Sequence, residues 1–179
     1  LMGGKDAKGK FQALLEEAAG GKVLGHDLYL YIRQNSSIWG LNEEYISSAA
    51  LDDLECAWAC TQGFLAAPET AAIPVLCVFD NEEVGSSTKQ GAAGTFLNDV
   101  MTRIGFALGA NESQIRAAMA GSFMVSADNA HAFHPAHAEK YDPKSRVYMN
   151  GGVVIKQSAN QKYTTDAVSE AVTKMICEK

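Results

Sequence analysis

The sequence lacks several features that would place a protein in a common class at first sight. It has no dense run of Lys or Arg and carries a formal net charge of -6, so it offers little to phosphate backbones or anionic membranes. No apolar run approaches the roughly 20 residues that span a bilayer, and the start, Leu1 to Lys5, lacks the apolar core of a signal peptide. We therefore expect no nucleic-acid partner, no membrane partner and a cytoplasmic location.

Cysteine is also too sparse for a disulfide framework, with four residues in 179. Cys56 and Cys60 lie four residues apart in an apolar helical pattern. That spacing can bring two thiolates to one metal ion. The alternative, which we favour, is that both are small apolar side chains on a helix face.

Motifs of several frequent enzyme classes are absent from this stretch. It contains no Gly-rich phosphate loop, no Gly-x-Ser-x-Gly elbow and no His-Glu-x-x-His zinc helix. What is present is the balance of a globular protein, with 47% hydrophobic and 20% charged residues. The length suits one main domain.

Hydrophobic periodicity predicts helices and strands in alternation. The predicted helices are Gly9 to Ala19, a segment from Ser48 that Pro68 closes, Gly91 to Leu108, Glu112 to Ala120 capped by Asn111, and a last helix capped by Thr164 or Thr165. The predicted strands are His26 to Arg33, Ile73 to Phe79, Ser122 to Ala127, and Gly152 to Gln157. This order indicates an α/β fold, with a mixed, mostly parallel sheet flanked by helices.

Acidic residues follow two of the predicted strands directly. Asp80 comes after one and Asp128 after another, and ligands of open α/β sheets bind outside the carboxyl ends of strands. If the first helical turn with Asp52 and Asp53 reaches the same edge, several carboxylates converge. Their repulsion raises their pKa values unless cations neutralise them. The pattern favours a site for two Zn, Mn or Co ions.

The neighbouring residues add two further candidates. Glu82 and Glu83 are adjacent, so one can bind metal while the other acts as a base, although an acidic pair in a loop is more often a solvated turn. The stretch from Ser126 to Pro135 adds His131 and His134 after Asp128, and a plain strand end is an equal alternative.

Four ordered motifs together resemble the aspartyl aminopeptidases, the M18 metallopeptidases. The motifs are Ser48-Ala-Ala-Leu-Asp-Asp-Leu54, Phe79-Asp-Asn-Glu-Glu-Val-Gly-Ser86, Ser126-Ala-Asp-Asn-Ala-His-Ala-Phe-His-Pro135, and Gly152-Val-Val-Ile-Lys156 with Gln161-Lys-Tyr163. The resemblance implies a two-metal aminopeptidase-like catalytic domain acting on peptide substrates with acidic N-terminal residues. It also implies two Zn²⁺ per site, with Co²⁺ or Mn²⁺ as alternatives, and a homo-oligomer, for which we expect a dodecamer.

The resemblance also assigns roles to individual residues. It implies that Asp52 bridges the two metal ions, that Glu83 and Asp128 are terminal ligands, and that Glu82 is the general base. It suggests substrate-binding roles for His131 and Lys156, although for both residues we slightly favour a structural role.

Two histidine ligands of the family are missing from this stretch. The family takes one from an upstream His-x-Asp motif and another from near its C-terminus, and neither His26, which Asp27 follows directly, nor His137 matches them. We expect an internal piece of a longer polypeptide, with residues 1–36 ending an inserted dimerisation domain and residues 37–179 belonging to the catalytic domain. On its own this piece is expected to bind zinc weakly and to hydrolyse nothing.

Two other functions stay open at this point. One is a two-metal aminopeptidase with a different specificity, since one sequence does not define the pocket for the N-terminal side chain. The other is a non-catalytic scaffold relative that has lost metal ligands.

Overall fold

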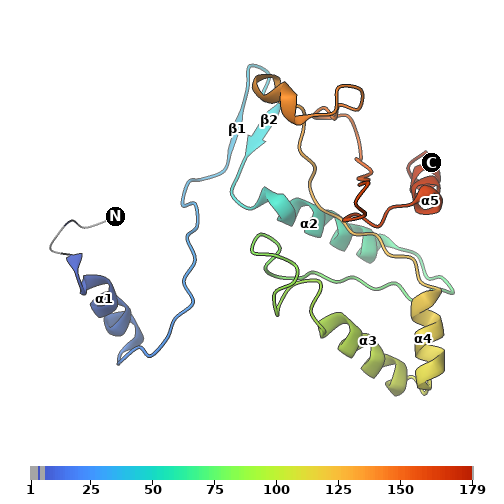
Figure 1. Ribbon diagram of the computed structural model, residues 1–179, viewed down its shortest axis with the longest axis horizontal. Helices are drawn as coiled ribbons and strands as arrows, with labels where there is room; N and C mark the ends of the chain where they lie inside the picture. Colours follow the sequence, from blue (N-terminus) through green and yellow to red (C-terminus); the bar gives the residue numbers. More distant parts are fainter. Residues whose placement is uncertain (1–3, 5–6, 179) are drawn as a thin grey trace. The chain divides into compact units, whose positions relative to one another are not determined.

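The computed structural model describes residue 4 and residues 7–178, so part of the predicted dimerisation insert lies outside the described residues. The chain forms two compact units, Leu1–Ala49 and Ala50–Lys179. Figure 1 shows the elements along the chain. The domain boundary predicted after residue 36 was inferred from the resemblance to a family with an inserted domain. It stays a prediction.

The first unit begins with helix α1 (Lys10–Ala19), as the sequence predicts. Gly20 takes a left-handed conformation, with φ of 67°, that glycine adopts without strain. The N–H of Gly21 then donates to the carbonyl of Glu16 at 3.1 Å, which closes the helix in a Schellman-type cap.

A small antiparallel hairpin follows in the same unit. Strands β1 (Ser37–Trp39) and β2 (Tyr45–Ser47) pair with Ile38 opposite Ile46. The rings of Trp39 and Tyr45 lie opposite each other with centroids 4.7 Å apart, and the Trp39 indole N–H donates to the Ser47 hydroxyl at 2.6 Å. Periodicity analysis treats this stretch as a polar break, because strands of three residues are too short to show alternation.

The second unit contains most of the helices. They are α2 (Leu51–Ala66), α3 (Phe96–Ala107), α4 (Glu112–Ala120), the 3₁₀ helix η2 (Pro135–Lys140) and α5 (Ala167–Cys177). Helix α3 begins five residues later than periodicity predicts, because the residues before it form tight turns.

Helices α3 and α4 pack against each other as a helical pair. Ile115 of α4 is the single buried hydrophobic residue among those described, with 9% of its surface exposed. It lies against Gly105 of α3, where an added Cβ would come within 2.5 Å of the Ile115 side chain. The missing side chain at Gly105 therefore lets the two helices approach closely.

Side-chain caps define the starts of α4 and α5. Asn111 accepts from the N–H of Gln114 at 3.0 Å while Gln114 accepts from the N–H of Asn111, so the predicted cap is confirmed and forms a capping box. The predicted cap of the last helix was wrong. Asp166, not Thr164 or Thr165, accepts from the N–H of Ser169 at 2.8 Å, because its carboxylate combines a capping acceptor with a charge favoured by the helix dipole.

None of the four predicted strands is paired among the described residues. These are the segments 26–33, 73–79, 122–127 and 152–157, which the structure shows without regular secondary structure. The prediction of a mixed, mostly parallel sheet is therefore not realised within these residues. The physical reason is that a strand needs a neighbour to exchange N–H and C=O bonds with, and the described residues bring none alongside.

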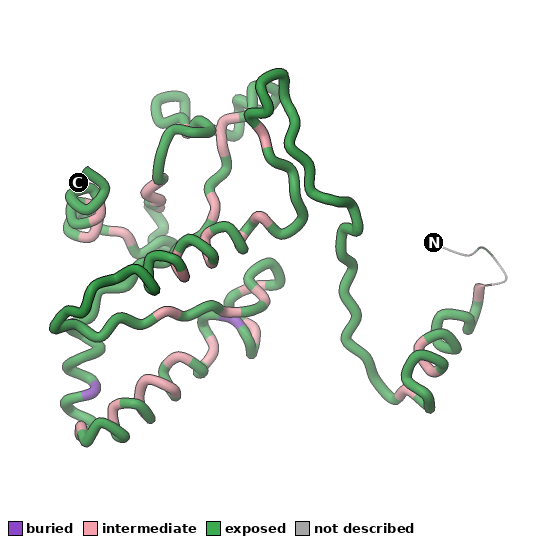
Figure 2. Tube along the Cα trace, turned by 180° about the vertical axis from the view of Figure 1, so that it is seen from behind, coloured by how far each residue is buried: buried purple, intermediate pink, exposed green. Residues whose placement is uncertain are grey.

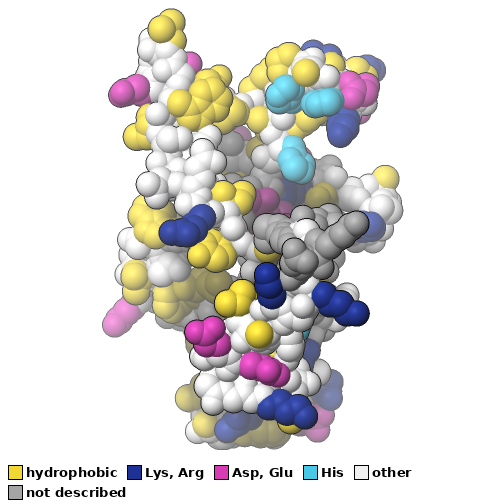
Figure 3. All heavy atoms as spheres, turned by 90° about the vertical axis from the view of Figure 1, so that its left-hand side faces the viewer, with side chains coloured by type: hydrophobic (Ala, Val, Ile, Leu, Met, Phe, Trp, Pro, Cys, Tyr) yellow, Lys and Arg dark blue, Asp and Glu magenta, His cyan; other side chains and the backbone are white. Residues whose placement is uncertain are grey.

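Most of the chain is consequently exposed, as Figure 2 shows along the trace. Large apolar side chains lie at the surface, and Figure 3 shows exposed hydrophobic side chains in yellow. Leu30 of the predicted first strand is 100% exposed and Val153 of the predicted last strand is 80% exposed. Such surfaces are typical of segments that pack against further protein.

Among the helices that the structure describes, none is both long and apolar enough to cross a membrane.

Tight turns connect the glutamate pair to α3. The N–H of Gly85 donates to the carbonyl of Asn81 at 2.8 Å, and the N–H of Ala93 donates to that of Ser86 at 2.9 Å. Gly91 is buried in the turn, and a Cβ there would lie 2.3 Å from the Ser86 carbonyl oxygen. The turn therefore requires glycine at this position.

We predict that Gly91→Ala destabilises this turn by about 2 kcal/mol, because the new methyl group clashes with backbone. Hydrogen exchange of the Ala93 amide in the protein that contains this chain should become roughly 30-fold faster. The control is Gly63→Ala in α2, where an added Cβ meets nothing within 4 Å. Unchanged exchange at Ala93 in Gly91→Ala would contradict this account of the turn.

Candidate metal centre

The start of helix α2 presents two adjacent carboxylates. Asp52 and Asp53 lie in its first turn but have non-helical backbone angles, with ψ of 109° and 22°. The peptide bond between them is cis. The regular helix therefore starts after this pair, whose side chains lie at its N-terminal end, where the helix dipole favours negative charge.

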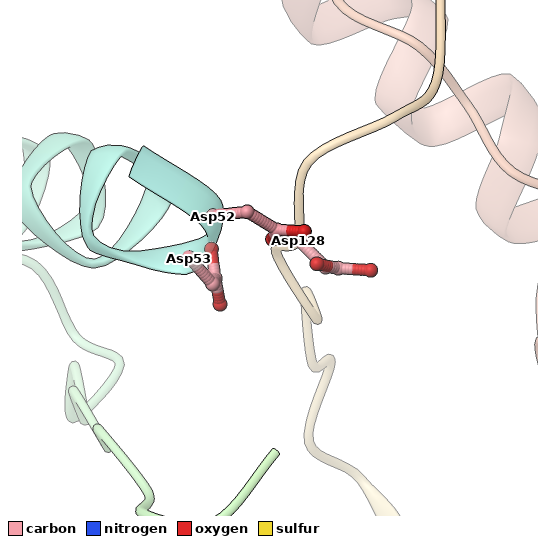
Figure 4. A group of neighbouring side chains, drawn as sticks. All are labelled: Asp52, Asp53 and Asp128. Atoms are coloured by element: carbon pink, nitrogen blue, oxygen red, sulfur yellow. The ribbon is translucent and has the colours of Figure 1, made fainter. Parts of the chain in front are cut away.

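A third carboxylate comes to these two from a distant part of the chain. Asp128 lies in an extended segment that passes the start of α2, and Asp52 reaches toward it in Figure 4. One carboxylate oxygen each from Asp52, Asp53 and Asp128 lie within 4.8 Å of one another. The structure thus brings together two of the predicted metal ligands and adds Asp53, which the sequence prediction had not named as one.

Desolvation and the negative charges of this cluster raise the pKa of Asp52. Loss of water contact and the negative charge of Asp128 raise the pKa of Asp52, to which Glu83 and Asp53 also contribute. In addition, the Oδ1 atom of Asp53 is shielded from solvent and has no hydrogen-bond partner among the described residues. The cluster therefore has acceptor capacity and negative charge that a cation would satisfy.

Lys156 neutralises part of this charge. Its Nζ donates to Oδ2 of Asp128 at 2.5 Å and to the carbonyl oxygen of Asn129 at 2.6 Å. The hydrogen bond from Lys156 lowers the pKa of Asp128 despite its partial burial. Lys156, a predicted substrate-binding residue, therefore forms an ion pair with Asp128, a predicted metal ligand.

Asn129 connects the same segment to helix α2. Its Nδ2 donates to Oε2 of Glu55 at 3.1 Å, and its Oδ1 accepts from the Cys56 thiol at 3.1 Å. Burial, followed by the effect of the neighbouring Asp53 carboxylate, raises the pKa of Cys56 to about 11, so the thiol keeps its proton at neutral pH. Cys56 is thus a hydrogen-bond donor here.

Glu82 and Glu83 lie outside the group of three carboxylates but close enough to affect it. Both are exposed, in the turn after the 73–79 segment. Desolvation and the charge of Glu83 raise the pKa of Glu82, and the charges of Asp128 and Asp52 add to the effect. The predicted base therefore lies in the field of the cluster, while the structure does not join Glu83 to it as a ligand.

The segment after Asn129 is an ordered loop held by aromatic contacts. Phe133 donates its N–H to the carbonyl of Val147 at 2.7 Å, and its ring packs 5.7 Å from those of Tyr141 and Tyr148. The Tyr141 hydroxyl donates to the carbonyl of His131. The His131 backbone is thus fixed near Asp128, whereas His134 caps η2 by accepting from the N–H of Ala136 at 3.2 Å.

The residues present fit a divalent cation. Carboxylate oxygens suit Zn, Mn and Mg ions, and three of them converge on one point. No imidazole belongs to this group among the described residues. The donor set is therefore that of a carboxylate-rich metal site that further ligands would complete.

Comparison with known families places this chain in a defined class, the zinc metalloproteases. Residues 6–179 match the family described as aminopeptidase I zinc metalloprotease, M18. The chain therefore belongs to the M18 family. The predicted resemblance is confirmed.

Individual relatives agree with the family. The chain is 45% identical over 155 residues to a probable M18 family aminopeptidase 2 of Clostridium acetobutylicum, covering 87% of this chain and 36% of the relative. It is 34% identical over 163 residues to aspartyl aminopeptidase 1 of Schizosaccharomyces pombe, covering 88% of this chain and 34% of the relative. The chain thus spans about a third of the length of these relatives.

Solved structures show the same fold. Chaetomium thermophilum mApe1 matches with a TM-score of 0.73 and 30% identity, over 98% of this chain and 42% of that one. A structure of the Ape4 and Nbr1 complex matches with a TM-score of 0.67 and 34% identity, over 81% of this chain and 29% of that one. The described elements are therefore part of an M18 aminopeptidase fold.

We predict that Lys156→Met raises the pKa of Asp128 in the metal-free protein, because the hydrogen bond that favours its ionised form is lost while Asp52 remains beside it. Carboxyl ¹³C NMR titration would measure this shift. With a lowered folded-state pKa, Asp128 stabilises the fold above the pKa of an unfolded aspartate, and this contribution is lost as pH falls through the lowered value. The variant should weaken that pH dependence.

Lys174→Met is the matched control for this titration. Lys174 pairs with Glu170 within α5, so its loss should raise the pKa of Glu170 and leave Asp128 unchanged. An unchanged pKa of Asp128 in Lys156→Met would contradict the ion pair.

Proposed function

We propose that the protein containing this chain is a zinc-dependent aminopeptidase that removes acidic residues, Asp or Glu, from the N-termini of peptides. The observation that carries the proposal is the convergence of Asp52, Asp53 and Asp128 in a chain of the M18 family. The relative in Schizosaccharomyces pombe, which is named an aspartyl aminopeptidase, supports the acidic specificity.

In this proposal Asp52 is the bridging carboxylate of the metal site. Asp128 is a terminal ligand. Glu83 is the terminal ligand of the second ion, although it lies outside the carboxylate group in this structure. Bound zinc would supply Lewis-acid activation of the scissile carbonyl and of a water molecule. The residue roles remain proposals, supported by the cluster geometry and the matched motifs.

Glu82 acts as the general base. Its carboxylate takes a proton from the attacking water as the new C–O bond forms, and it returns this proton to the departing amine nitrogen as the C–N bond breaks. One water molecule is consumed and the base is regenerated. The raised pKa of Glu82, caused by desolvation and by Glu83 and Asp128, supports this role because a stronger base accepts the proton more readily.

Lys156 and His131 contribute to substrate binding in this proposal. Lys156 provides a positive charge beside the cluster that suits an acidic N-terminal side chain. His131 lies in the ordered loop after Asp128, at an exposed position from which it can face a substrate. Homo-oligomerisation, with a dodecamer as the expected size, and a cytoplasmic location stay predictions from the sequence.

We predict that Glu82→Gln lowers kcat by roughly 10²- to 10⁴-fold, because the amide cannot take the proton of water. Zinc content, measured by atomic emission after dialysis, should remain that of the wild type. Glu69→Gln changes an exposed glutamate between α2 and the 73–79 segment and should retain wild-type turnover. The assay uses the protein with all its segments and α-aspartyl p-nitroanilide as substrate.

Wild-type turnover in Glu82→Gln would overturn the assignment of the base. The same assay with leucyl and lysyl substrates separates the two specificities. Preference for the leucyl or lysyl substrate would replace acidic specificity with neutral or basic specificity, and no hydrolysis of any of them would favour the scaffold alternative.

A further inference from the structure

The side chain of Asn129 makes two contacts with helix α2 and uses both ends of its amide. Its Nδ2 donates to Oε2 of Glu55, and its Oδ1 accepts from the thiol of Cys56, each at 3.1 Å. These partners lie 74 and 73 residues away in the sequence. The amide therefore joins two segments that local structure does not connect.

This connection lies directly beside the carboxylate cluster. Asn129 follows Asp128 in the chain, while Glu55 and Cys56 lie within about one turn of Asp52. The carboxylates of Asp52 and Asp128 bring like charges within 4.8 Å of each other, so they repel. An attractive contact is needed close by to hold the two segments together.

Apolar packing does not supply that contact. The residues that precede Asp128 are exposed, with Met124 at 75% and Val125 at 69%, so no buried side chain of theirs fixes the segment against α2. Within the described residues, polar contacts therefore hold Asp128 beside α2. Besides the Asn129 amide, the structure shows the Lys156 ammonium bound to Asp128 and to the carbonyl oxygen of Asn129.

The chemistry of the three groups is complementary. A carboxamide offers one donor end and one acceptor end, and Glu55 provides an acceptor while the protonated Cys56 provides a donor. An aspartate at position 129 would place a carboxylate against Glu55 and lose the donor. An alanine would remove both contacts.

We propose that Asn129 is a positioning residue that holds Asp128 beside Asp52 for metal binding, through its hydrogen bonds to Glu55 and Cys56. The inference rests on the proposed function, since it concerns the same metal site. It adds three residues, none of them a metal ligand, that determine how well the ligands are placed. Such supporting contacts typically change metal affinity or activity by 10- to 100-fold.

The test measures zinc dissociation constants of the whole protein by competition with a chromophoric chelator. Asn129→Ala should weaken zinc binding by at least about tenfold. Asn98→Ala, an exposed asparagine on α3, is the matched control and should stay within about twofold of wild type. Thermal unfolding of the metal-free proteins shows whether each variant remains folded.

Variants of Glu55 separate positioning from general loss of structure. Glu55→Ala removes the acceptor and should weaken zinc binding, whereas Glu55→Gln keeps a side-chain oxygen for the Asn129 N–H and should largely restore it. The double variant Asn129→Ala, Glu55→Ala should be no weaker than Asn129→Ala alone, because both changes remove the same hydrogen bond. If Asn129→Ala fails to fold, the Glu55 pair decides the question.

Wild-type zinc affinity in a folded Asn129→Ala, or equal losses in Glu55→Ala and Glu55→Gln, would overturn this inference and leave the proposed function intact. Additive losses in the double variant would also overturn it. A wild-type protein that binds no zinc would remove the proposed function and this inference together.

Discussion

Bringing like charges together is the constraint on which the second unit of this chain depends. Asp52 and Asp53 at the start of α2 and Asp128 from a distant segment place carboxylate oxygens within 4.8 Å of one another. Repulsion between them opposes folding unless opposite charge or hydrogen bonds compensate. Here the compensation comes from Lys156, which binds Asp128, and from Asn129, which bonds to Glu55 and Cys56. A bound cation would strengthen the same arrangement.

The second constraint is the shortage of buried apolar surface. Ile115 is the single buried hydrophobic residue among those described, and the segments predicted as strands are extended and unpaired. A chain of this kind depends on additional protein to cover its apolar side chains and to pair its backbone. The relatives are about three times longer than the matched region.

Local signals in the sequence were sufficient for several elements. Helices α1 and α4 were predicted correctly because glycine stops and an Asn111 cap act within a few residues. The start of α5 was placed at a threonine because threonine and aspartate are both good caps, and only the structure shows that Asp166 is used. The pairing of the strands could not be predicted from a local sequence pattern, because each strand pairs with residues elsewhere.

The candidate site likewise contains some residues that the sequence predicted and others that it did not. Acids at predicted strand ends and at a helix start indicated that Asp52 and Asp128 would meet, because charge and position are both visible in a sequence. Asp53 was expected among the converging acids but was not assigned as a metal ligand, because an adjacent acid in a first turn has an ordinary role at the positive end of the helix dipole. Asn129 escaped because a neutral amide carries no charge pattern, and its partners on α2 are known only once the two segments are placed together.

The central claim is that Asp52 and Asp128 hold one metal ion between them. Crystals of the whole protein grown with zinc, with anomalous data collected above and below the zinc absorption edge, test it directly. The account predicts a zinc ion about 2.0–2.2 Å from a carboxylate oxygen of each of these residues. Anomalous density that lies away from both carboxylates, or a Lys156 ammonium that occupies the position between them, would contradict it.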